Sequence, residues 1–120
     1  MERELLKGTT PGLILAVLED GPLHGYGVAR EIERRAGGGL KFKEGTLYPA
    51  LHALEAGGWV SSQWEVREEG PGRPSRKSYT LTEEGRGELK RRRALWNRFS
   101  QAIGSALGQG RESGGEVDAA

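Results

Sequence analysis

Apolar residues recur at helical spacing in three successive stretches of the chain. The first stretch follows Thr10-Pro11, a pair that suits the cap and the first position of a helix, and it ends at Asp20-Gly21-Pro22. The second stretch ends at Gly37-Gly38-Gly39 and the third at Gly57-Gly58. Their apolar positions are Leu13, Ile14, Val17 and Leu18; Val28, Ala29, Ile32 and Ala36; and Leu47, Ala50, Leu51 and Leu54. This spacing predicts three short amphipathic helices.

After the third stretch the period changes to two. Apolar and polar residues alternate over residues 60–66, which predicts a strand. Residues 70–74 have the glycine and proline content of a turn, and the alternation resumes over residues 76–81. The pattern predicts a β-hairpin in which Trp64 packs against Tyr79 across the two strands.

A final helix is predicted over residues 83–107. Thr82 can cap its first turn, although Gly85 stands where a full capping box would have Glu or Gln. An apolar stripe repeats every seven residues along this helix and consists of Leu89, Trp96 and Ile103, with Phe99 interleaved. A core of three short helices cannot cover such a stripe alone, so we expect the helix to join two chains in a homodimer.

Composition narrows the class of protein. The chain of 120 residues contains no cysteine, which excludes disulfides and thiolate chemistry. It has no apolar run of the about 18–20 residues that span a bilayer, and no secretory signal precedes the first helix, so we expect a cytoplasmic protein. Glycine, serine and acidic residues dominate residues 108–120, which we expect to form a disordered tail.

The net charge of +1 is unevenly distributed. Residues 1–69 carry eight basic and eleven acidic residues, whereas residues 70–82 carry three basic residues and no acid. These three are Arg73, Arg76 and Lys77, on the predicted hairpin. Guanidinium and ammonium groups donate hydrogen bonds without accepting any, which suits phosphate oxygens.

Three helices followed by a hairpin predict an α+β winged helix-turn-helix over residues 1–82. Domains of this kind place a recognition helix in the major groove of double-stranded DNA, and their wing reaches the backbone or the minor groove. On a helical projection the third helix turns a small, polar and aromatic face outward. The residues that we expect near DNA are Tyr26, Gly45, Thr46, Tyr48, Pro49 and His52, together with Arg73, Arg76 and Lys77. Tyr26 should be half-buried, and the alternative for Tyr48 is packing against the neighbouring helix.

Other functions are less well supported by the residues. The glycine triplet lacks the Lys and Ser or Thr of a phosphate-binding loop, and no nucleophile–base pair stands out, so we do not expect an enzyme. His24 and His52 are far apart in the sequence and have no acidic cluster beside them, so we expect neither a metal site nor a cofactor. We expect His24 to be a capping or turn residue. A winged helix used only for protein interaction stays as the alternative, although such a module needs no acid-free wing.

Five short segments resemble signature segments of the PadR-like family of transcriptional regulators. They are Leu6-Lys7-Gly8-Thr9, residues 21–27 (GPLHGYG), residues 44–51 (EGTLYPAL), Leu54-Glu55 with Gly58, and residues 79–85 (YTLTEEG). The resemblance covers residues 5–107 and implies a dimeric repressor of detoxification, efflux or stress genes, bound to an operator with an inverted repeat. It also implies that the counterparts of Thr46, Tyr48, Arg76 and Lys77 approach DNA.

The single C-terminal helix resembles the compact branch of this family. One group in that branch binds planar drugs at the dimer interface, stacked on a tryptophan to which Trp96 is similar. Arg91, Arg92, Arg93 and Arg98 crowd this segment, and acidic residues that would favour a cationic drug are few. We therefore expect a repressor released by a small aromatic effector near Leu89, Trp96, Phe99 and Ile103, and an anionic or neutral effector stays open beside a cationic one.

Overall fold

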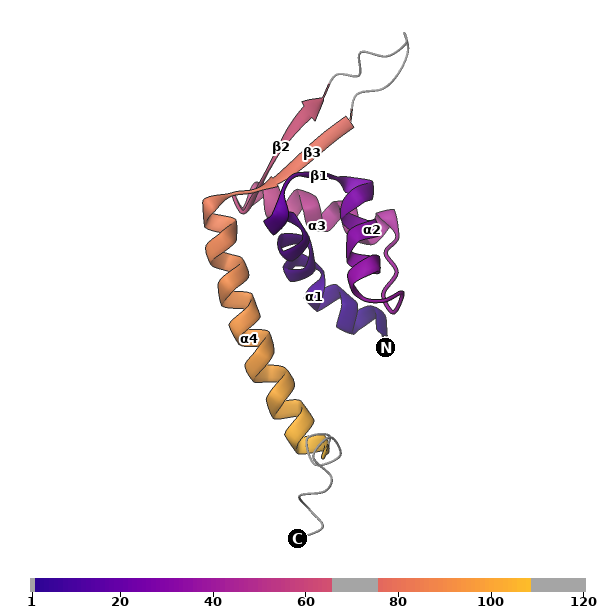
Figure 1. Ribbon diagram of the computed structural model, residues 1–120, viewed down its shortest axis with the longest axis vertical. Helices are drawn as coiled ribbons and strands as arrows, with labels where there is room; N and C mark the ends of the chain where they lie inside the picture. Colours follow the sequence, from indigo (N-terminus) through magenta and orange to yellow (C-terminus); the bar gives the residue numbers. More distant parts are fainter. Residues whose placement is uncertain (1, 66–75, 109–120) are drawn as a thin grey trace. The chain divides into compact units, whose positions relative to one another are not determined.

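The computed structural model describes residues 2–65 and 76–108 of the chain (Figure 1). The chain divides into two compact units, Met1–Leu89 and Lys90–Ala120. The elements are α1 (Glu2–Val17), the 3-10 helix η1 (Leu18–Asp20), β1 (Leu23–His24), α2 (Gly25–Arg35), α3 (Glu44–Ala56), β2 (Val60–Glu65), β3 (Arg76–Leu81) and α4 (Glu83–Leu107). This confirms the α+β winged helix-turn-helix. No helix in the described part of the chain is long and apolar enough to cross a membrane.

The first helix begins well before the predicted position. α1 starts at Glu2, so Pro11 lies inside the helix and Thr10 is not its cap. Residues 2–7 are mostly strong helix formers, whereas Pro11 costs the helix the hydrogen bond of its missing N–H and crowds the carbonyl four residues earlier. Burial of Ile14 and Leu15 against the rest of the unit stabilises the second half of the helix, so propensity and packing outweigh the cap signature.

The three strands form one antiparallel sheet in the order β1-β3-β2. Leu23 of β1 is opposite Tyr79 of β3, and Ser62 of β2 is opposite Tyr79 on the other side. The sequence did not predict β1, because a strand of two residues is too short to show an alternation. Its edge pairing depends on β3 being next to it in the fold.

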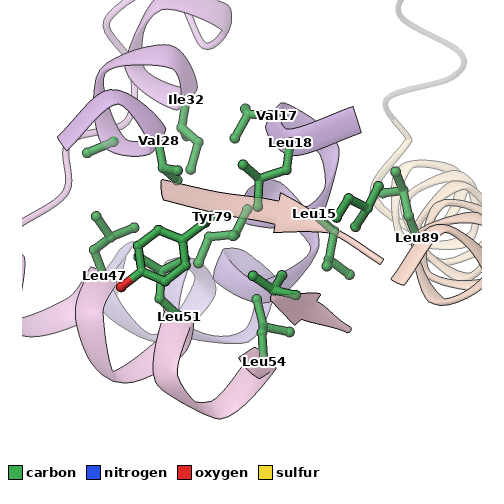
Figure 2. Packing of buried hydrophobic residues seen from close by; sticks show 14 residues of the cluster. Leu15, Val17, Leu18, Val28, Ile32, Leu47, Leu51, Leu54, Tyr79 and Leu89 are labelled. Atoms are coloured by element: carbon green, nitrogen blue, oxygen red, sulfur yellow. The ribbon is translucent and has the colours of Figure 1, made fainter. Parts of the chain in front are cut away.

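Trp64 does not pack where the sequence predicted. The register places Trp64 opposite Lys77, whereas Tyr79 lies opposite Ser62, two residues further along each strand toward the core. Tyr79 is consequently buried among core leucines (Figure 2), while Trp64 is 64% exposed. Both side chains lie on the same face of the hairpin, but that face extends beyond the core at Trp64.

One hydrophobic core joins all the helices and strands of the unit Met1–Leu89. Its largest buried side chains come from α1, η1, α2, α3, β2 and β3, and Figure 2 shows the cluster converging around Tyr79. Leu89 of α4 belongs to the same cluster and is only 3% exposed. The seven-residue repeat had grouped Leu89 with the dimer residues, but its side chain is buried within its own chain.

The start of α4 is held by Thr82, as predicted. The Thr82 Oγ1 atom accepts a hydrogen bond from the Gly85 N–H at 2.9 Å and donates one to the Gly58 carbonyl at 2.7 Å. Gly58, with φ +82°, occupies the left-handed region where the chain turns from α3 into β2. A side chain at Gly85 would overlap the Trp59 carbonyl oxygen, so close packing excludes the Glu or Gln of a capping box.

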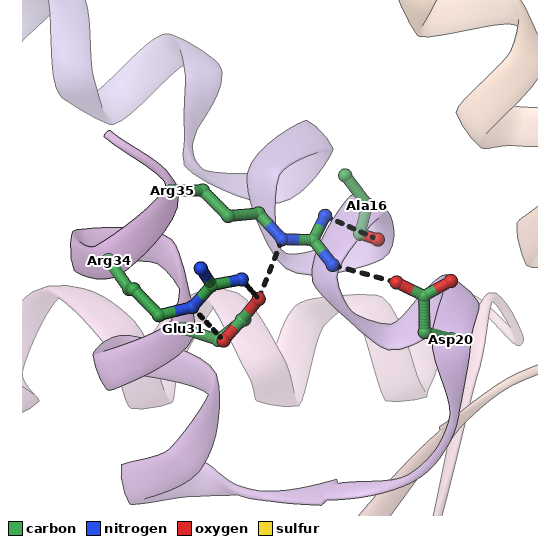
Figure 3. Close-up of polar contacts among 5 residues, drawn as sticks. All are labelled: Ala16, Asp20, Glu31, Arg34 and Arg35. Atoms are coloured by element: carbon green, nitrogen blue, oxygen red, sulfur yellow. Dashed lines mark hydrogen bonds and ion pairs between the residues drawn. The ribbon is translucent and has the colours of Figure 1, made fainter. Parts of the chain in front are cut away.

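A network of charged side chains connects α2 to the end of α1 and to η1 (Figure 3). The Glu31 carboxylate accepts hydrogen bonds from Arg34 at 2.6 Å and from Arg35 at 2.8 Å. Arg35 also donates to Asp20 at 2.9 Å and to the Ala16 carbonyl at 3.3 Å. The hydrogen bonds from Arg34 and Arg35 lower the pKa of Glu31 to about 2, so this carboxylate stays charged well into the acid range.

Candidate nucleic-acid interface

α3 has two chemically different faces. Its buried face consists of Leu47, Leu51 and Leu54, each no more than 3% exposed, which pack into the core. Its exposed face includes Gly45, Thr46, Pro49 and His52. The side chains of Gly45, Thr46 and Pro49 are small or compact, which leaves this part of the α3 backbone open to close approach by a groove of DNA.

Tyr48 lies between these faces and is half-buried. A Cβ atom at Gly25 of α2 would lie 2.6 Å from the Tyr48 hydroxyl oxygen, so the absence of a side chain at Gly25 accommodates the tyrosine ring. The ring of His52 lies 6.5 Å from the Tyr48 ring, centre to centre. The contacts therefore match the alternative reading, packing of Tyr48 against the neighbouring helix, and its contact with DNA stays a prediction.

Tyr26 is more exposed than the sequence suggested. It is 68% exposed at the start of α2, not half-buried. Arg30, one helical turn later, donates a hydrogen bond to the Tyr26 hydroxyl at 2.7 Å and its guanidinium lies 5.5 Å from the ring centre. Sequence reasoning did not single out Arg30, although the spacing of four residues on a helix was the available signal. Because Tyr26 projects into solvent and holds a cation, this pair could contact a phosphate.

The described cations of the wing have acidic neighbours from other elements. The Arg76 Nε atom lies 3.9 Å from the Glu65 Oε1 atom, and the Lys77 Nζ atom lies 3.8 Å from the Glu55 Oε1 atom. The third cation predicted for the hairpin, Arg73, lies outside the described residues. The segment that carries Arg76 and Lys77 thus contains no acidic residue of its own, but acidic side chains of α3 and β2 lie close to its cations in the fold.

His24 and Glu65 form a second polar link at the wing. The His24 Nε2 atom lies 2.8 Å from the Glu65 Oε1 atom, across β3. This hydrogen bond and the nearby charges of His24 and Arg76 hold the pKa of Glu65 below its ordinary value. His24 occupies the cap position of α2, but its side chain does not cap the helix; it ties β1 to β2 instead. Neither Glu55 nor Glu65 was among the candidate residues.

The unit Lys90–Ala120 presents an exposed apolar stripe along α4. Its large side chains, each more than two-fifths exposed, are Leu95, Trp96, Phe99, Ile103 and Leu107. The rings of Trp96 and Phe99 lie 5.9 Å apart, centre to centre, and are tilted by 42°. Such a row of aromatic and aliphatic side chains in water marks a surface that a partner can cover.

The sequence matches the model of the PadR-like transcriptional regulator family over residues 14–91. The chain belongs to this family. The match runs from the second half of α1 through α3 and both strands of the wing to the beginning of α4. The family consists of transcriptional regulators and not of enzymes, which confirms the expectation from the sequence motifs.

Individual relatives agree with the family assignment. A transcriptional regulator of Mycobacterium tuberculosis is 35% identical over 103 residues, which cover 85% of this chain and 90% of that protein. The structure of a PadR family regulator from Eggerthella lenta is 32% identical, with a TM-score of 0.73, over 89% of this chain and 88% of that one. Bacillus subtilis PadR, solved in complex with operator DNA, is 28% identical, with a TM-score of 0.58, over 67% of this chain and 44% of that one.

Proposed function

We propose that this regulator is a homodimeric repressor that occupies an operator through α3 and the wing. The observation that carries the proposal is the exposed face of α3, where Gly45, Thr46 and Pro49 have small or compact side chains beside a helix core of buried leucines. The relative from Bacillus subtilis was solved in complex with operator DNA, which supports DNA binding by this chain. Occupation of an operator would repress transcription by excluding the polymerase.

In this proposal the two parts of the interface have different tasks. Thr46 and His52 offer a hydroxyl and an imidazole that can hydrogen-bond to base edges in the major groove, where each base pair has its own pattern of donors and acceptors. Arg76 and Lys77 contact phosphates, which position the protein but carry no sequence information. Sequence preference therefore comes from α3 and salt-dependent affinity from the wing.

The dimer comes from the exposed stripe of α4. Pairing the stripes of two chains would remove Trp96, Phe99 and Ile103 from water. A two-fold dimer presents two copies of α3, so its operator would be an inverted repeat with half-sites about one turn of DNA apart. Linking two weak half-sites raises the overall affinity without any new contact to DNA.

We also propose that a small aromatic effector binds beside Trp96 and releases the operator. The rings of Trp96 and Phe99 are tilted by 42° rather than stacked, so a planar molecule could use an indole face that neither Phe99 nor the paired helix covers. To cause release, the effector has to bind the dimer geometry that holds DNA poorly better than the DNA-bound geometry.

Fluorescence anisotropy with DNA from the region upstream of the protein's own gene tests the operator proposal. Thr46→Ala should weaken binding to the operator by about 1–3 kcal/mol and leave binding to a scrambled duplex unchanged. Thr80→Ala, on the exposed side of β3, is the matched control and should change neither. A wild-type protein that binds no duplex would favour the protein-interaction module instead.

Tryptophan fluorescence tests the effector. Anionic and neutral planar aromatics, for example a naphthalene sulfonate and riboflavin, would be titrated into the wild type and into Trp96→Leu. The variant is needed because Trp59 and Trp64 also fluoresce. Saturable quenching that requires Trp96 and that lowers operator affinity supports the proposal, whereas the same quenching in both proteins contradicts it.

A further inference from the structure

We propose that Glu55 and Glu65 are internal competitors of DNA, whose carboxylates take the place of phosphate groups at Lys77 and Arg76 in the free protein. DNA binding would then exchange each internal ion pair for a contact between cation and phosphate. This inference rests on the proposed function, since it concerns how the wing engages DNA. It assigns a role in DNA affinity to two acidic residues outside the expected DNA contacts.

Lys77 is held on the face of the sheet that packs against α3. It is opposite Trp64 in the register and on the same face as the buried Tyr79. The Lys77 Nζ atom lies 3.8 Å from Glu55 of α3 and 5.4 Å from the centre of the Trp64 ring. The ammonium group thus rests between a carboxylate and an exposed indole, both of which favour a cation.

Glu55 connects the recognition helix to the wing. Besides its contact with Lys77, its carboxylate accepts a hydrogen bond from the Ser62 hydroxyl of β2. Glu55 follows His52 by three residues on α3, so it lies at the border between the predicted base-reading face and the hairpin. A DNA backbone that passes between α3 and the wing would meet this carboxylate, and like charges repel.

The other face of the hairpin has the same arrangement. Arg76 is opposite Glu65 in the register, and the Arg76 Nε atom lies 3.9 Å from Glu65 Oε1. The same Glu65 oxygen is hydrogen-bonded to His24 at 2.8 Å. Glu65 is thereby held in position by β1 while it faces the cation of β3.

The two ion pairs of the wing, Arg76 with Glu65 and Lys77 with Glu55, are loose enough for DNA phosphates to replace the carboxylates. Their charged atoms are 3.8 and 3.9 Å apart, whereas Glu31 and Arg34 on α2 are 2.6 Å apart in a two-point contact. The Arg76–Glu65 pair is exposed and the Lys77–Glu55 pair is half-buried, and loose ion pairs near the surface contribute little to stability. Duplex DNA offers a dense row of phosphates, and its condensed counterions are released on binding. Arg76 and Lys77 can therefore leave their carboxylates for DNA, at a cost that is equal for every DNA sequence.

The functional consequence is that the electrostatic, sequence-independent part of DNA binding is limited. Each carboxylate opposes the attraction between the wing and any duplex, while the contacts from α3 to bases are unaffected. The protein is thus less readily retained on unrelated DNA at low salt. Removing either carboxylate should strengthen binding to operator and unrelated duplex alike.

The test uses the full chain carrying either Glu55→Gln or Glu65→Gln. Each variant is titrated against the operator and against a scrambled duplex at salt concentrations between about 50 and 200 mM. Each variant should bind both duplexes about two- to fivefold more tightly at the lower salt. Each should also steepen the plot of log affinity against log salt by about 0.9. Glu31→Gln removes the same charge from the pair on α2, and its slope should stay at the wild-type value.

Two further measurements keep the outcomes distinct. Ser62→Ala removes the hydrogen bond to Glu55 but keeps the charge, so it should leave the salt slope unchanged. Glutamine variants that fold, as judged by circular dichroism, and bind DNA no more tightly than the wild type would overturn the inference. A wild-type protein that binds no duplex would overturn the proposed function instead.

Discussion

Two apolar side chains of α4 are buried to very different degrees. Leu89 is 3% exposed in the core of the unit Met1–Leu89, whereas Trp96, seven residues later, is 51% exposed. In the sequence the two residues belong to a single repeat. The difference teaches that one regular apolar stripe can enter the core of its own chain at one position and stay exposed seven residues later.

The largest effect is expected from the exposed end of this stripe. Trp96→Ser combined with Phe99→Ser should turn a two-chain species into a one-chain species, because the apolar surface that would drive pairing is removed. Operator affinity should fall by about a hundredfold or more, since the half-sites are no longer linked. Sedimentation and anisotropy measure the two effects. A stable wild-type monomer would contradict the prediction.

The buried end of the stripe should act on folding instead. Leu89→Ala leaves a cavity in the core and should lower the free energy of unfolding by about 2–5 kcal/mol. Lys90→Ala, at the exposed next position of α4 and outside the apolar stripe, is the control and should change it by no more than about 0.5 kcal/mol. Denaturant unfolding followed by circular dichroism measures both values. Equal losses in the two variants would contradict a role of Leu89 in the core.

Two glycines near the buried end should respond with opposite signs. A Cβ at Gly85 would meet the Trp59 carbonyl and lie 2.7 Å from Leu81 Cδ1, so Gly85→Ala should cost about 1–3 kcal/mol. Nothing lies within 4 Å of a Cβ at Gly87, so Gly87→Ala should stabilise the helix by about 0.5–1 kcal/mol. Melting temperatures decide the sign. A loss in both variants would mean that Gly87 is also packed.

The smallest effect is expected in acid. The pKa of Glu31 is lowered from 4.5 to about 2 in the folded chain, so its contribution to stability is present above pH 4.5 and is lost as the pH falls toward 2. Because the Glu31 side chain is partly open to solvent, the effect should be modest. The free energies of unfolding of the wild type and of Glu31→Gln are compared at pH 6, 4 and 3. The difference between the two proteins should shrink as the pH falls. A constant difference would argue against the ion pair with Arg34 and Arg35.

The positions of the helices and of the hairpin were predictable because they depend on the pattern of apolar and polar residues over a few neighbouring positions. The buried leucines of α3 and the burial of Tyr79 and Leu81 follow from periods that are visible along the chain. The early start of α1, the strand β1 and the exposed position of Trp64 did not follow from the sequence. In each case the deciding interaction involves another element: the core against α1, the edge of β3 for β1, and the register of β2 on β3 for Trp64.

The sequence by itself indicated the family through its five signature segments. It also determined the main helices with their buried faces and the hairpin, because apolar period and turn residues act over a few neighbouring positions. Only the tertiary structure decided the electrostatic state of the wing. The segment of Arg76 and Lys77 has no acid of its own, yet Glu55 of α3 and Glu65 of β2 lie within 4 Å of these cations. Charge interacts through space, so the neighbours of a charged side chain depend on which elements pack together and not on residue number.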